Sequence, residues 1–162
     1  MLLRYIGEEM LSLTQLQDLI TEFVERFAKN VGIEYRLPTP IAVTSTDNKF
    51  WNRLIEIHPW HLHPMDVLPS AKSVAVFAIP LSYSAIEFNV SGENPSRQWL
   101  VEYVYTNQLI EEVGIYIAKV LKNKGFKTVP IKPTGDYDPK ELRSKSVSYT
   151  HLRAHETSLH LV

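Results

Sequence analysis

The sequence contains no cysteine and no long apolar run. Without cysteine, the chain as given can form no disulfide, has no thiolate nucleophile and cannot ligate zinc or an iron–sulfur cluster through sulfur. No stretch approaches the roughly 20 apolar residues that span a bilayer, and the opening MLLRYIGEEMLSL lacks the apolar core and cleavage site of a signal peptide. We therefore expect a cytoplasmic protein with no membrane partner.

The chain also lacks a large excess of either positive or negative charge. The chain has 17 lysines and arginines against 18 aspartates and glutamates, a net charge of −1. This balance gives no electrostatic argument for a nucleic-acid surface over the whole protein, although a local patch for one RNA arm stays open. At 162 residues, with 44% hydrophobic and 22% charged residues, the chain has the composition of a globular protein of about one domain.

The first third of the chain predicts a helix, a strand and a short helix. Apolar residues recur at helical period from Ser12 to Asn30, with a capping-box spacing at Thr14 and Gln17, and Gly32 lies where a helix commonly ends. Residues 41–45 predict a short strand, and Asp47 is expected to cap the helix NKFWNRLIEI that follows.

The middle of the chain predicts strands around one long helix. SVAVFAIPL (73–81) is typical of a strand buried on both faces, SYSAIEFNVSGENPS (82–96) of a polar connector, and FKTVPI (126–131) of another strand. Asn94 and Pro95 are expected to start a helix that stops at Gly125. Its expected inward line is Leu100, Tyr103, Asn107, Ile110, Gly114, Ile117 and Leu121. This order predicts a mixed α/β (α+β) fold, with a layered sheet and packed helices.

Two groups of residues are candidates for chemistry. The segment HPWHLHP places His58, His61 and His63 close together, but no carboxylate pair completes a set of metal ligands. An ordered loop is favoured over a metal site, and a single histidine that faces a ligand ranks between these two alternatives. Asn107 is either a buried amide bonded to neighbouring backbone or an amide presented to a cofactor or substrate. Tyr103 is ambiguous in the same way. No P-loop, GxGxxG or Ser/His/Asp pattern is present.

The last residues suggest a metal site that we reject. His151 and His155 are four apart, the spacing of zinc-binding helices. However, Val147 to Thr157 matches the translation of a transposase-type sequencing adapter without a mismatch, and residues 160–162 continue it. We interpret residues 146–162 as a non-native, adapter-derived tail. Residues 1–145 are then the incomplete N-terminal region of a longer protein, which starts at Met1 or Met10.

The authentic part resembles a known family. LPSAKSVAVFAIPL is similar to the stretch and buried strand near the start of epoxyqueuosine reductase and its iron–sulfur relatives. The similarity continues in NPSRQWLVEYVYTNQLIEEVGIYIAKVLKNKGFKTVPI, because family members also carry a helix with Tyr and Asn, a glycine ending and a strand after it. The resemblance covers about Leu13 to Lys145 and implies the truncated N-terminal part of a larger reductase domain.

The resemblance implies a cobalamin-dependent reductase with two [4Fe–4S] clusters. Such an enzyme takes electrons from a donor protein and removes the epoxide oxygen of epoxyqueuosine in tRNA, giving queuosine. The cluster cysteines and the catalytic acid of the family lie downstream, so we expect no catalytic residue or metal ligand here and an inactive fragment. Tyr103, Asn107 and His63 are the candidates for lining the corrinoid or substrate cavity. An electron-transfer or corrinoid-binding accessory protein, or a reductive-dehalogenase-like reductase, is the alternative.

Overall fold

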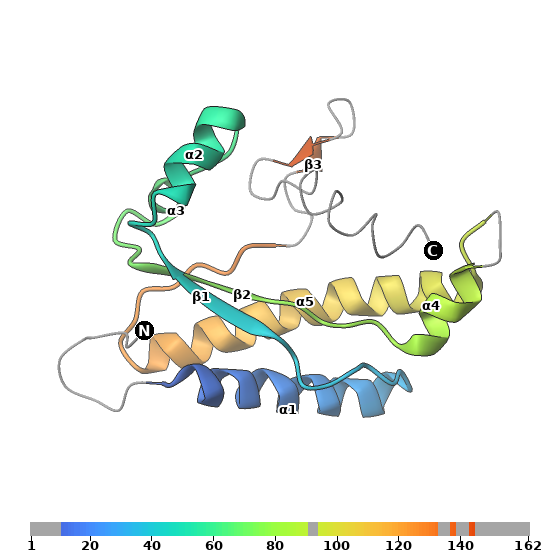
Figure 1. Ribbon diagram of the computed structural model, residues 1–162. Helices are drawn as coiled ribbons and strands as arrows, with labels where there is room; N and C mark the ends of the chain where they lie inside the picture. The colour runs from blue at the N-terminus through green and yellow to red at the C-terminus, as the bar shows by residue number, and fades with distance from the viewer. Residues whose placement is uncertain (1–10, 91–93, 133–136, 139–142, 145–162) are drawn as a thin grey trace.

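The computed structural model describes residues 11–90, 94–132, 137–138 and 143–144, so the expected tail 146–162 lies outside the described residues (Figure 1). The elements are helices and short strands, and the fold is mixed α/β. In chain order they are α1 (Leu13–Val31), β1 (Ile41–Ser45), α2 (Phe50–Ile57), α3 (Pro64–Val67), β2 (Ser73–Phe77), α4 (Tyr83–Val90), α5 (Arg97–Asn123), β3 (Tyr137–Asp138) and β4 (Arg143–Ser144). None of the helices in these ranges is long and apolar enough to cross a membrane.

The core lies between the two long helices and one face of the β1–β2 sheet. Helices α1 and α5 pack against each other, and α1 also contacts β1 (Figure 1). Ile41 of β1 and Phe77 of β2 pack against the buried cluster from the sheet side. The fully buried members of the cluster are Ile20, Val24, Leu109 and Val113, and Leu16, Tyr35, Ile79 and Ile117 complete it.

Helix α1 agrees with the predicted range, but its first turn is capped differently. Ser12 Oγ accepts the N–H of Gln15 at 3.1 Å, and Gln15 Oε1 accepts the N–H of Ser12 at 2.8 Å. The predicted capping pair, Thr14 and Gln17, is therefore wrong, because Ser12 is the extended residue that precedes the helix. Gly32 ends the helix as predicted, with φ of 70° in the left-handed region that glycine enters most easily.

The sheet is two-stranded and antiparallel, with Ile41 opposite Phe77 and Ser45 opposite Ser73. The predicted strand at 73–81 ends at Phe77, and it is not buried on both faces. Val76 is 58% exposed, because the helices in the described part of the chain pack against the other face of the sheet. An apolar strand thus forms as predicted, but with one packed face.

Two segments of the second half differ from the predictions. The expected polar connector contains α4, which begins where Ser82 Oγ accepts the N–H of Ala85 at 3.1 Å. Its apolar side chains lie on several sides, so periodicity could not reveal it. Residues 126–131 pair with no described strand. Thr128 Oγ1 instead donates to the carbonyl of Ala118 at 3.1 Å, which holds this segment on α5.

Two helix starts also differ. Ser96, and not Asn94, caps α5, since Ser96 Oγ accepts the N–H of Trp99 at 3.1 Å. Helix α2 starts after Lys49, which makes no side-chain cap, and Asn48 Oδ1 accepts the N–H of Phe50 at 3.0 Å in place of the expected Asp47.

Candidate functional site

The face that α5 buries differs from the predicted one as far as Val113, whereas Ile117 is buried as predicted. Its buried residues are Glu102, Thr106, Leu109, Val113 and Ile117. For most of its length this line lies one residue before the predicted line, which is a rotation of about 100° on an α-helix. Leu100 and Tyr103, both expected to point inward, are each 47% exposed. The prediction was wrong because the buried line begins with two polar side chains, which a search for apolar period passes over.

Glu102 fastens α4 to α5. Its carboxylate is buried and accepts two hydrogen bonds from Ser82, one from the backbone N–H and one from the hydroxyl. Ser82 also caps the first turn of α4 by accepting the N–H of Ala85. Because one serine serves both the carboxylate and the helix start, the position of α4 depends on Glu102.

A second polar contact joins α5 to the segment after α1. Thr106 Oγ1 donates to the hydroxyl of Tyr35 at 3.1 Å. Burial raises the pKa of Tyr35, the charge of Glu102 raises it further, and the Thr106 hydrogen bond acts in the opposite direction. Next to it, Arg36 Nε donates to the carbonyl of Leu81 at 2.7 Å, and its guanidinium lies 4.8 Å from the ring centre of Tyr83. The only signal in the sequence for Glu102 and Thr106 is their helical spacing from the buried Leu109 and Val113.

The exposed side of α5 carries two of the three predicted site residues. Tyr103 stacks on Trp99, with ring centres 5.1 Å apart and planes 16° from parallel. Asn107 Nδ2 donates to the backbone carbonyl of Tyr103 at 2.8 Å. Asn107 is partly buried, and this bond to neighbouring backbone is the one expected if its amide has a structural role. We call Trp99, Tyr103 and Asn107 the aromatic–amide surface.

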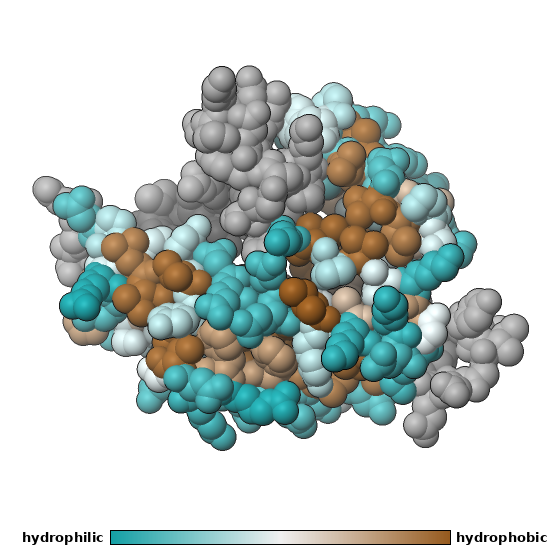
Figure 2. All heavy atoms as spheres, turned by 180° about the vertical axis from the view of Figure 1, so that it is seen from behind, coloured by the Kyte–Doolittle hydropathy of each residue, from teal (hydrophilic) through white to brown (hydrophobic). Residues whose placement is uncertain are grey.

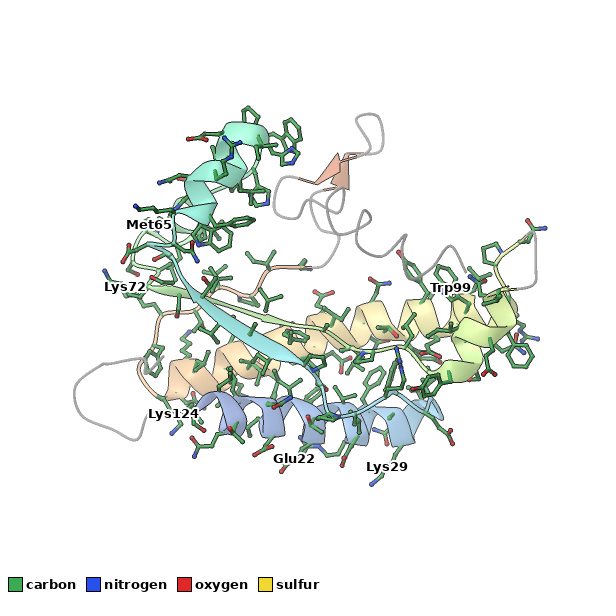
Figure 3. The ribbon with its side chains drawn as sticks, viewed as in Figure 1. Glu22, Lys29, Met65, Lys72, Trp99 and Lys124 are labelled. Carbon is green, nitrogen blue, oxygen red and sulfur yellow. The ribbon has the colours of Figure 1, made fainter. Side chains whose placement is uncertain are left out.

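His63, the third predicted site residue, lies elsewhere. The ring Nδ1 of His63 accepts the backbone N–H of Met65 at 3.2 Å, so the imidazole caps the short helix α3. The backbone N–H of His63 donates to Asp66 Oδ2 at 2.8 Å. Figure 3 shows Met65 at the end of the molecule opposite Trp99. The structure therefore brings Tyr103 and Asn107 together and leaves His63 apart. Across the residues that the structure describes, no three His, Cys, Asp or Glu side chains form a group that could hold a metal ion.

The surroundings of the aromatic–amide surface are apolar. A hollow of about 330 Å³ lies along the same stretch of α5, lined by Arg97, Leu100, Val101, Val104 and Tyr105. Figure 2, seen from behind, shows apolar residues exposed in several patches between hydrophilic ones. Stacked rings and an amide beside apolar side chains can bind a flat, largely apolar ligand through packing and one or two hydrogen bonds.

Comparisons of the chain with known protein families, curated proteins and solved structures gave no match.

Proposed function

We propose that this chain is the N-terminal region of an epoxyqueuosine-reductase-like protein. The complete protein would be a cobalamin- and [4Fe–4S]-dependent oxidoreductase that acts on tRNA in queuosine formation. The observation that carries the proposal is the stretch LPSAKSVAVFAIPL followed, after the α4 segment, by the helix sequence NPSRQWLVEYVYTNQLIEEVGIYIAKVLKNKGF.

The resembling stretches supply much of the packed centre of the fold. The first contains β2 and contributes Phe77 and Ile79 to the core. The second is α5, with the buried Leu109 and Val113, and it is followed by Gly125 at φ of 86°. Residues that fix a core and a helix end are constrained by packing and backbone geometry. A resemblance at these positions therefore supports a shared arrangement of these elements.

The chain's residues fit the two cofactors unequally. No cysteine is present, so the chain does not fit a [4Fe–4S] cluster, and cluster ligands would have to come from further polypeptide. A corrinoid fits better, because Tyr103 offers an exposed ring and Asn107 an amide that can hydrogen-bond to amide groups at a corrin edge. When bound, the corrinoid supplies the cobalt redox chemistry. Tyr103 and Asn107 would bind and orient it.

The first test is a longer copy of the same gene. We expect its sequence to depart from the present one near residue 146 and to encode C-x-x-C-x-x-C-x-x-x-C-P repeats and a catalytic acid. The complete protein, made without oxygen, should bind cobalamin and convert epoxyqueuosine in tRNA to queuosine. Cluster motifs without the acid would favour the accessory protein, and a continuation without cluster motifs would contradict the proposal.

The second test is Asn107→Ala in that complete protein. Loss of one ligand hydrogen bond, about 0.5–1.5 kcal/mol, should raise the Kd for cob(II)alamin about 2- to 12-fold. Asn123→Ala is the matched control, since Asn123 is exposed at the other end of α5 and should leave the Kd unchanged. Unchanged corrinoid affinity and turnover in Asn107→Ala would rule out this role for the amide. Melting temperatures of both variants separate a binding effect from a loss of stability.

A further inference from the structure

The outward side of α5 carries an apolar stripe in its N-terminal half. Val104 lies two residues after the buried Glu102, which places it about 200° away around the helix. It is 63% exposed, and Leu100 and Val101, one turn earlier, are also exposed. Helices α1 and α4 pack on the buried side of α5 (Figure 1). Three large apolar side chains therefore point away from the core.

The stripe contains a hollow of the kind that receives a side chain from another helix. Among the described residues, α5 alone lines this hollow of about 330 Å³, with Arg97, Leu100, Val101, Val104 and Tyr105. The first four stand at positions i, i+3, i+4 and i+7, which is the spacing of the four residues around a hole in knobs-into-holes packing. A second helix that lies along the stripe can therefore insert a side chain between them.

The two ends of the stripe carry complementary polar groups. At one end, Arg97 has no ion-pair partner within the described residues. At the other end, Gln108 is exposed, and its Nε2 donates to Glu112 Oε1 at 2.8 Å, which leaves its own oxygen available as an acceptor. Glu111 and Glu112 add two carboxylates one turn beyond Gln108. We call Leu100, Val101 and Val104, with Arg97 and Gln108 at the ends, the outer stripe.

We propose that the outer stripe binds the outer stripe of a second copy of this chain, with the two α5 helices antiparallel. A two-fold axis between positions 101 and 104 places Val101 opposite Val104 of the partner subunit. The same axis places Arg97 opposite Gln108 of the partner subunit, because both pairs are symmetric about one point. Each guanidinium then meets an amide oxygen and lies one turn from two carboxylates.

This symmetry favours a second copy over an unrelated partner. In an isologous contact one surface must supply both halves of every interaction, and the outer stripe has its cation and its acceptor at equal distances from the apolar centre. Tyr103 points about 100° away from Val104, so the aromatic–amide surface lies to one side of the contact. The inference therefore does not depend on the proposed function. Because the contact is only about 17 Å long, we expect a weak dimer that exchanges with monomer.

Sedimentation velocity of the full 162-residue chain, measured over a range of concentrations, tests the surface. The wild type should shift from monomer towards dimer as the concentration rises. Val104→Glu introduces two charges into the apolar centre of each dimer and should raise the dimer Kd about 100-fold or more. Ile115→Glu is the matched control, since Ile115 is 53% exposed on the same side of α5 but would face position 90, outside the partner's α5. It should leave the Kd unchanged, and circular dichroism should show both variants folded.

Cross-linking tests the antiparallel orientation. The chain has no cysteine, so an introduced thiol is unique in each variant. A mixture of Val101→Cys and Val104→Cys should form a disulfide-linked dimer under mild oxidation faster than either variant alone, because the two positions face each other across the axis. A mixture of Val104→Cys and Ile115→Cys should give little of this product.

Four outcomes would overturn the inference. The first is a wild-type chain that stays monomeric at every concentration and gives no cross-link in the mixture. The second is a dimer that Val104→Glu leaves intact, or that both glutamate variants weaken equally. The third is faster cross-linking of each cysteine variant alone, which would indicate parallel helices. The fourth is a longer copy of the same gene that is monomeric while the 162-residue chain dimerises, which would assign the outer stripe to further polypeptide.

Discussion

Replacing Glu102 with alanine should loosen α4 from α5. Glu102 is 5% exposed, and its carboxylate accepts two hydrogen bonds from Ser82. The substitution therefore removes the acceptor of both Ser82 donors at once. A hydrogen bond to a charged group contributes about 1.5–3 kcal/mol. The hydroxyl keeps its contacts with Ser84 Oγ and the Ala85 N–H, whereas the backbone N–H of Ser82 is left unpaired. We therefore expect Glu102→Ala to lower the free energy of unfolding by about 3 kcal/mol.

The variant Glu102→Gln keeps the shape of the side chain and removes its negative charge, so it separates the two contributions to stability. In Glu102→Gln the remaining oxygen can still accept the N–H of Ser82, and the hydroxyl can turn to accept from the new amide. The loss should then be about 1 kcal/mol. Glu87→Ala is the control, because Glu87 is exposed on α4 without a described partner, and its effect should stay within about 0.5 kcal/mol.

The measurements are urea denaturation and amide hydrogen exchange. Exchange should quicken in Tyr83–Val90 more than in α1, since the lost bonds hold α4. The reasoning is refuted if Glu102→Ala and Glu87→Ala unfold at the same urea concentration with equal protection of α4. A loss in Glu102→Gln as large as in Glu102→Ala would show that the negative charge, and not the geometry alone, holds the helix.

Two further predictions concern the backbone and the buried tyrosine. Gly32→Ala should cost about 1 kcal/mol in thermal denaturation, because φ is 70° there and no neighbour lies within 4 Å of the added methyl group; an unchanged melting temperature would contradict the left-handed helix end. Because burial raises the pKa of Tyr35, the unfolded chain ionises first, so wild-type stability should hold below about pH 10 and fall above it. Tyr35→Phe should lose about 1–2 kcal/mol at neutral pH, with Thr106 left unpaired, and lack that alkaline fall; parallel pH profiles of the two proteins would refute the assignment.

The sequence was most informative where local signals determine the structure. Helix α1, its end at Gly32 and the strand at 41–45 follow from apolar period and a glycine, which act over a few residues. The strand expected at 126–131 failed because forming a strand requires a neighbour to pair with, which local propensity does not specify. Of the candidate site, Tyr103 and Asn107 could be selected from the sequence. Glu102 could not, because its partner Ser82 lies 20 residues away.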